Sequence, residues 1–160
     1  MSRKLLSLCC ALALVAGMMG VSATEARASE EQPMIDGSYL THDDESVGYD
    51  TKKTRGEDLL VGYSKCARLG PGKLYVGGTT IAAHTVDDIG IGVSVERAQR
   101  GDDRWTGYTA WQKFNAGVDR IASNKTLEVE GGYYYRVCCI HSANSDLSSS
   151  FTDGVYIEEP

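Results

Sequence analysis

The sequence predicts an all-β fold, an antiparallel β-sandwich of about seven strands. From Leu59 onward, apolar residues alternate with polar or small residues, which is the pattern of a half-buried strand. Short sequences rich in Gly, Asp and Pro separate these segments and mark turns. No segment carries an apolar stripe with the helical period of about 3.6 residues. Short strands with turns between them are typical of two packed antiparallel sheets.

The clearest expected strand spans residues 86–97, where β-branched residues alternate with small and polar ones. A helix would be destabilised by the two glycines that lie close together in this segment. For Trp105 and Trp111, we favour burial in the core over an exposed platform for a sugar or peptide. The other strands are expected over residues 59–68, 73–84, 105–114, 118–129, 133–141 and 151–157.

Residues 129–135, Val-Glu-Gly-Gly-Tyr-Tyr-Tyr, fit the tyrosine corner of immunoglobulin-like and fibronectin type III sandwiches. In such a corner a tyrosine hydroxyl bonds back to the backbone of the preceding turn, and Tyr135 is in that register. The two-residue period of a strand then directs Val137 and Cys139 inward. We therefore expect Tyr135 to be structural.

The same period directs Tyr134 and Arg136 to the outer side of the strand. Together with Tyr133, they form a candidate binding surface, because exposed aromatic and arginine side chains often anchor protein interfaces.

The chain is expected to have three parts. Residues 1–28 read as a signal peptide, with a basic start, a short apolar run and an Ala-Arg-Ala cleavage pattern. Residues 29–58 contain few apolar residues and are expected to form a polar, flexible arm before a β-sandwich domain over residues 59–160. The alternative is that part of the arm forms a short strand on an open sheet edge, through Ile35, Tyr39, Leu40, Val47 and Tyr49.

Export and charge restrict the expected partners. The signal peptide predicts a secreted, extracellular protein that has no membrane attachment after cleavage. The formal net charge of −6 argues against nucleic acid and anionic lipid, since both need clustered Lys and Arg.

Cys66, Cys138 and Cys139 remain after cleavage at residue 28. An oxidising environment favours a disulfide from Cys66 to one of the adjacent pair, with Cys139 the candidate. The alternative is that all three are reduced and buried as small hydrophobic residues.

Cys139 and His141 lie two residues apart and therefore share one strand face, as a cysteine nucleophile and its base would need. An inward Cys139 would be unreactive, however, because burial raises the pKa of a thiol. The three histidines have no zinc-ligand spacing, and no cofactor is expected. Acidic pairs in the expected loops leave calcium open, although no calcium-loop motif is present.

The predicted domain contains several distinctive short motifs: Gly77-Gly78-Thr79-Thr80-Ile81-Ala82, Val86-Asp87-Asp88-Ile89-Gly90-Ile91, Trp105 with Trp111, Gly132-Tyr133-Tyr134-Tyr135-Arg136-Val137, His141-Ser142-Ala143 and Thr152-Asp153-Gly154-Val155-Tyr156-Ile157. On these motifs, residues 59–157 resemble a family of small exported proteins of unknown function from Gram-positive, clostridia-type bacteria. The resemblance implies secretion and a bacterial source, and it implies no activity and no site residues.

These observations together predict a secreted, non-enzymatic binding module that recognises an extracellular protein, peptide or glycan. This prediction follows from the exclusion of nucleic acid, anionic lipid and cofactor chemistry, together with analogy to other sandwich domains. The alternatives are a secreted cysteine-dependent hydrolase built on Cys139 and His141 and a structural component of an envelope or spore layer.

Overall fold

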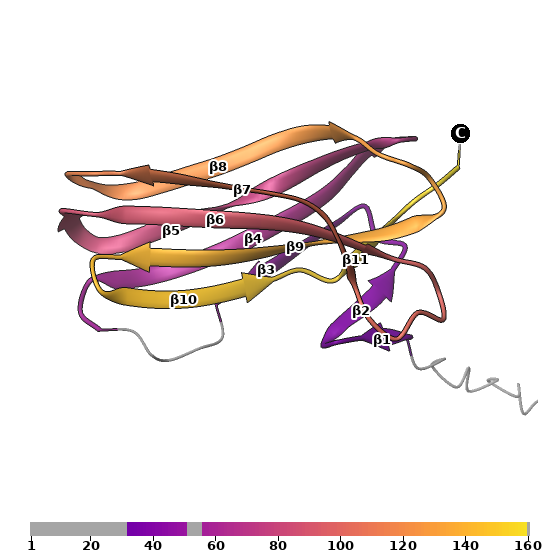
Figure 1. Cartoon of the computed structure of the whole chain (residues 1–160), viewed down its shortest axis with the longest axis horizontal. Coiled ribbons are helices and arrows are strands. Elements are labelled where there is room, and N and C mark those ends of the chain that lie inside the picture. The colour runs from indigo at the N-terminus through magenta and orange to yellow at the C-terminus, as the bar shows by residue number, and fades with distance from the viewer. Residues whose placement is uncertain (1–31, 51–55, 160) are drawn as a thin grey trace, which may run out of the picture. The chain divides into compact units, whose positions relative to one another are not determined.

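The computed structural model describes residues 32–50 and 56–159 and is an all-β sandwich (Figure 1). The expected signal peptide, residues 1–28, lies outside the described residues. The strands are β1 (Met34–Ile35), β2 (Ser38–Thr41), β3 (Glu45–Tyr49), β4 (Leu59–Gly70), β5 (Lys73–Val86), β6 (Ile89–Ala98), β7 (Thr106–Asn115), β8 (Val118–Glu128), β9 (Tyr133–Ala143), β10 (Asp146–Phe151) and β11 (Gly154–Ile157).

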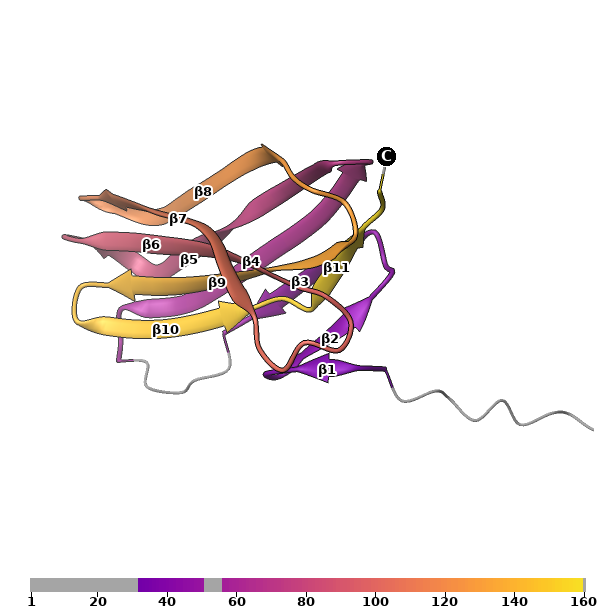
Figure 2. The ribbon, with the colours of Figure 1, turned by 45° about the vertical axis from the view of Figure 1, so that its right-hand side comes forward.

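The strands form two sheets that face each other, as the views in Figures 1 and 2 show. The first sheet has the order β1-β2-β11-β9-β6-β7, and β10 also pairs with β9. The second sheet has the order β3-β4-β5-β8. The predicted sandwich is therefore confirmed, but it is not wholly antiparallel, because β2 pairs with β11 in parallel.

The main core lies between β6 of the first sheet and β5 of the second. On β6, Ile91 and Val95 are fully buried, while the intervening positions Gly92 and Ser94 lie on the outer side of the sheet. Leu74 and Val76 of β5 belong to the same core. The alternation predicted for residues 86–97 therefore arises because the apolar residues face the interior of the sandwich and the intervening residues face outward.

The structure corrects the expected number and limits of the strands. Residues 151–157 are not one strand, because Thr152 and Asp153 lie outside both strands and separate β10 from β11 along the chain. β10 itself was missed by the sequence analysis, since its buried side chains are polar, including those of Ser148 and Ser150. Trp105 precedes β7 rather than lying within it.

Asp146 shows how β10 can be stable with polar side chains facing the interior of the sandwich. Its Oδ2 accepts the backbone N–H groups of Asp58 and Leu59 at 2.8 and 3.0 Å. These backbone hydrogen bonds lower the pKa of the carboxyl group and keep it ionised. The carboxylate thereby holds the start of β4 against the first sheet.

The expectation of a flexible arm over residues 29–58 is wrong for residues 34–49, which form β1, β2 and β3. The alternative strand pairing is what the structure contains: β3 pairs with β4, and β2 pairs with β11. Ile35 and Leu40 are buried in a second, smaller core with Ala98, Trp105 and Tyr134. Two buried side chains are enough to hold this N-terminal segment in place. The rest of the domain supplies the other residues of the smaller core and an open sheet edge for the segment to pair with.

Among the described residues, no helix is long and apolar enough to cross a membrane.

Candidate interaction surfaces

The predicted surface of Tyr133, Tyr134 and Arg136 is largely covered. Tyr134 and Arg136 do lie on the outer side of β9, but they are only 4% and 6% exposed. The turn between β1 and β2 covers Arg136, whose Nη1 donates to the carbonyl oxygen of Asp36 and to Ser38 Oγ, both at 3.0 Å. The prediction is therefore wrong for these two residues, because it treated the covering segment as flexible.

Arg136 is instead a structural cation. Its Nε donates to Glu96 Oε2 at 2.8 Å, and its guanidinium lies 4.7 Å from the centroid of the Trp105 ring. The indole N–H of Trp105 donates to the carbonyl oxygen of Ile35 at 2.8 Å. These contacts fasten the N-terminal strands to the first sheet.

Tyr135 confirms the tyrosine corner. Its side chain belongs to the main core, and its hydroxyl donates to the carbonyl oxygen of Glu130 at 2.9 Å. Burial raises the pKa of this hydroxyl. The neighbouring Tyr133 is half-buried, with its ring 4.4 Å from the Arg97 guanidinium.

The predicted disulfide between Cys66 and Cys139 is not formed, and the three cysteines among the described residues are free thiols. Cys66 Sγ lies 3.4 Å from the carbonyl oxygen of Tyr135, four residues along β9 from Cys139. That separation corresponds to about 13 Å of strand, which is too long for a disulfide. The alternative of buried, reduced cysteines describes Cys66 and Cys139.

His141 lies in a polar cluster that joins three strands. Its ring is fully buried, with Nδ1 2.9 Å from Thr80 Oγ1 of β5 and Nε2 2.8 Å from Ser150 Oγ of β10. Thr80 donates its own hydroxyl proton to the carbonyl oxygen of Gly90 at 3.0 Å. Nδ1 therefore carries the ring proton, and Nε2 accepts from Ser150. Burial lowers the pKa of His141 to about 4.

This geometry does not suit cysteine chemistry. Cys139 is 1% exposed, and burial raises the pKa of its thiol to about 12. Both ring nitrogens of His141 are occupied by hydroxyl groups and not by the thiol. Ser150 has the distance of a nucleophile from its base, but it is buried and Thr80 supplies a hydroxyl where a carboxylate would stabilise the imidazolium. The cluster acts as a clamp between strands.

Sequence reasoning missed Thr80 and Ser150 as partners of His141. The two hydroxyl residues lie far from His141 in the sequence or on an unrecognised strand, and no local pattern connects them. Gly62 also belongs to this cluster, since a Cβ at that position would overlap the His141 ring.

The first candidate surface, here called the tyrosine face, is the outer side of β3, β4 and β5 around Tyr49, Tyr63, Lys65 and Tyr75. Tyr49 is 62% exposed, and its ring centroid lies 5.9 Å from that of Tyr63, its partner in the register of β3 and β4. Lys65 Nζ lies 2.7 Å from a carboxylate oxygen of Glu45, which raises the pKa of the amine. A depression of about 370 Å³ next to these residues is lined by Lys65 and Tyr75.

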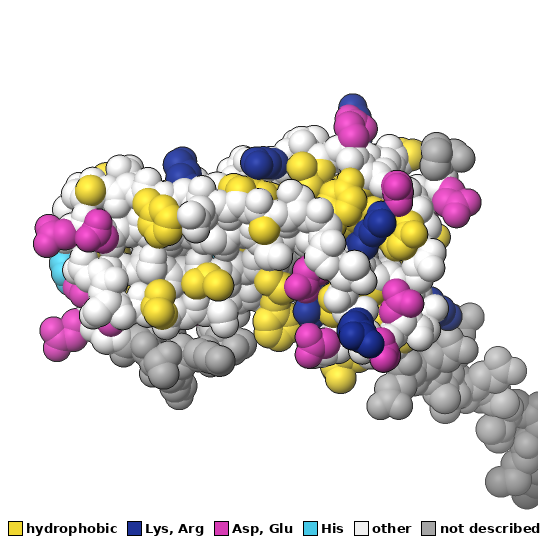
Figure 3. Space-filling model, viewed as in Figure 1, with side chains coloured by type: hydrophobic (Ala, Val, Ile, Leu, Met, Phe, Trp, Pro, Cys, Tyr) yellow, Lys and Arg dark blue, Asp and Glu magenta, His cyan; other side chains and the backbone are white. Residues whose placement is uncertain are grey.

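The second candidate surface, here called the glycine face, is the outer side of β7, β6, β9 and β10. It consists of uncharged side chains, and Figure 3 shows charged side chains gathered near its ends and its upper rim. Its members, row by row across the four strands, are Phe114, Gly90, Ser142 and Leu147; Gln112, Gly92, Ile140 and Ser149; and Ala110, Ser94, Cys138 and Phe151.

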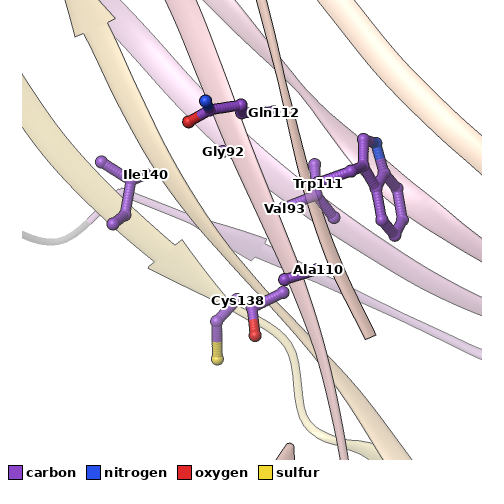
Figure 4. A pocket seen from close by; sticks show the side chains of 8 residues that line it. Gly92, Val93, Ala110, Trp111, Gln112, Cys138 and Ile140 are labelled. Carbon is purple, nitrogen blue, oxygen red and sulfur yellow. The ribbon is translucent and has the colours of Figure 1, made fainter. Parts of the chain in front are cut away.

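A shallow groove of about 490 Å³ lies in the middle of the glycine face. Figure 4 shows Ala110 of β7 on one side of β6, Cys138 and Ile140 of β9 on the other, and the side chain of Gln112 reaching from β7 toward β6 near Gly92. Cys138 is the most exposed of the three described cysteines, and burial still raises the pKa of its thiol to about 11.

Within residues 32–50 and 56–159, no group of His, Cys, Asp or Glu side chains is arranged to hold a metal ion. The acidic pairs that left calcium open therefore form no cluster of ligands there.

No protein-family model, curated protein or solved structure matches the chain. The class that the fold defines is a β-sandwich, and the resemblance to exported clostridia-type proteins stays a prediction.

Proposed function

We propose that the chain is a non-enzymatic interaction module that acts outside a bacterial cell and binds a surface glycan through the tyrosine face. The observation that carries the proposal is the adjacent ring pair of the exposed Tyr49 and the half-buried Tyr63, beside Lys65 and the depression lined by Tyr75. Tyrosine gives a large, rigid contact area at a small cost in conformational entropy, which is why it is common in binding surfaces.

The chemistry of the tyrosine face favours a glycan as the ligand. A tyrosine ring combines a flat apolar body with a polar hydroxyl group at its end. A sugar ring has the matching combination, an apolar C–H face with hydroxyl groups at its rim. Lys65 and Glu45 add a hydrogen-bond donor and an acceptor next to the rings.

Two further observations support a binding role over hydrolysis. The buried thiol of Cys139 has a raised pKa, whereas a nucleophile needs the thiolate form. The imidazole of His141 is engaged by Thr80 and Ser150. The extracellular location rests on the signal pattern of residues 1–28 and on the family resemblance.

A glycan array tests this function, with the protein compared with its Tyr49→Ala and Met34→Ala variants. Met34 is a matched control, because it is 58% exposed and lies on β1 of the other sheet. We expect Tyr49→Ala to weaken binding about tenfold, the loss of one aromatic contact worth about 1.4 kcal/mol. Met34→Ala should bind as the unaltered protein does. Equal losses in both variants, or no glycan bound at millimolar concentration, would contradict the proposal.

A further inference from the structure

The centre of the glycine face contains an unfilled space above Gly92. A Cβ atom built on Gly92 would meet only Ile140 Cβ, at an ordinary contact distance of 3.9 Å. Gly90, the next outward position on β6, differs because Phe114 and Ser142 already occupy the space above it. The groove of about 490 Å³ is therefore open at Gly92.

The side chain next to this space is a projecting aliphatic group. Ile140 is the register partner of Gly92 on β9 and is 63% exposed. An aliphatic side chain and an open space thus lie side by side on neighbouring strands. This pairing is self-complementary, since each feature fits the other on a second copy of the same surface.

We propose that two copies of the chain associate through their glycine faces, with Ile140 of each copy filling the space above Gly92 of the other. The two-fold axis would run along the strands, midway between β6 and β9. Such an axis places β6 of one copy opposite β9 of the other and β7 opposite β10. Residues of one row in the first copy then face residues of the same row in the second copy. Gly92 of one copy then faces Ile140 of the second copy, twice across the interface.

The other positions of the face also match under this symmetry. Phe114 faces Leu147 of the second copy, so two exposed apolar side chains meet. The small Ala110 faces the large Phe151, and the amide of Gln112 faces the hydroxyl of Ser149. Alternating large and small partners is how two sheet faces interdigitate.

Charge does not oppose a second copy at the glycine face. The chain has a net charge of −6, so two copies repel each other over most approaches. The glycine face carries no charged side chain among the residues that define its three rows. Contact through this face therefore desolvates no ion, which is typical of the centre of an interface.

The size of the face indicates a weak dimer. Four strands spaced at about 4.8 Å and about seven residues in length cover roughly 19 by 23 Å. Two such faces bury on the order of 900 Å², below the roughly 1,200–2,000 Å² of specific, stable interfaces. We therefore expect a reversible dimer with a dissociation constant of roughly 10–100 µM.

Sedimentation velocity of the exported protein between about 1 and 500 µM tests this dimer. The average mass should rise toward that of a dimer for the unaltered protein and stay monomeric for Ile140→Lys, whose dissociation constant should rise at least tenfold. Leu69→Lys is the matched control, because Leu69 is 56% exposed and lies on β4 of the other sheet; it should dimerise normally.

A mixing experiment tests the symmetry itself. Gly92→Asp alone and Ile140→Lys alone should each be monomeric, but an equimolar mixture should recover dimer. In the mixed pair Asp faces Lys at one contact, and the native Gly92–Ile140 contact remains at the other. Melting temperatures of the single variants verify that each is folded. A protein that is monomeric at 500 µM, a dimer that Ile140→Lys leaves intact, or a mixture that stays monomeric would each overturn the proposal.

Discussion

At the residue scale, His141 is a histidine that the fold holds in its neutral form. Its Nδ1 donates to Thr80, its Nε2 accepts from Ser150, and its ring packs over Gly62. Asp50 is the charged group that acts on it electrostatically, and it raises the pKa less than burial lowers it. A buried imidazole with both nitrogens engaged has no room for a second ring proton without losing the bond from Ser150.

The pKa of His141 makes the stability of the protein depend on pH. The folded value is about 4, whereas an unfolded histidine has a value of about 6.5. Protonation therefore favours the unfolded state: the contribution of His141 is complete above pH ~6.5 and is lost as the pH falls through ~4. The loss amounts to about 3 kcal/mol.

Denaturant unfolding between pH 7 and pH 4 measures this effect. His141→Gln should lose this part of the pH dependence, whereas His84→Gln, at a histidine that is 56% exposed in its side chain, should keep it. Parallel stability curves for the unaltered protein and His141→Gln would refute the assignment.

Tyr135 gives a second prediction at this scale. Tyr135→Phe should lower the free energy of unfolding by about 1–2 kcal/mol, because the carbonyl group of Glu130 loses its hydrogen-bond donor. Equilibrium unfolding in denaturant checks this, and unchanged midpoints would show that the hydroxyl is dispensable for the corner.

At the element scale, the strands differ in how far the sequence could predict them. β6 was predictable because its buried residues are β-branched and its outer residues are small or polar. β10 was not, since Asp146, Ser148 and Ser150 point inward and Leu147 points outward, the reverse of the usual pattern. Its inward position follows from partners on other strands, His141 of β9 for Ser150 and the distant start of β4 for Asp146.

β3 belongs to the fold through a close backbone contact. A Cβ on Gly48 would overlap the backbone of Phe151, so only glycine fits where β3 lies against the end of β10. Gly48→Ala should therefore lower the free energy of unfolding by more than about 2 kcal/mol, through a forced displacement of one strand. Gly107→Ala on β7 is the control, because no atom lies within 4 Å of its added Cβ. Equal stabilities of the two variants in urea would contradict the close packing of β3 against the end of β10.

Removal of all three N-terminal strands is the stronger form of this test. A chain that begins at Gly56 loses β3 from the second sheet and exposes Trp105 of the smaller core. Its melting temperature should fall by more than about 8 °C, beyond the 4–8 °C that corresponds to ~1 kcal/mol in a domain of this size. A smaller fall in melting temperature would indicate that these strands are only loosely attached to the domain.

At the scale of the whole molecule, the sandwich presents two outer faces with different chemistry. The tyrosine face combines aromatic rings with an ion pair, and the glycine face is uncharged. Association through the glycine face would leave both tyrosine faces of a dimer accessible. Two linked sites bind a repetitive polymer more tightly than either site alone.

The binding surface shows the limit of sequence reasoning at this scale. The aromatic surface was predicted at Tyr133 and Tyr134, adjacent in the sequence, but Tyr134 is covered by residues near the N-terminus. Tyr49, Tyr63 and Tyr75 come from three strands, and only the register of β3, β4 and β5 brings them to one surface. A pattern in one strand cannot report which residues of another strand lie beside it or above it.

A nuclear magnetic resonance titration of the labelled protein, with a glycan that binds on the array, locates the binding surface directly. We expect the largest chemical-shift changes around Val47, Tyr49, Tyr63 and Lys65, with little change at Ile140 on the opposite sheet. Changes confined to the glycine face, or no changes at millimolar glycan, would contradict glycan binding through the tyrosine face.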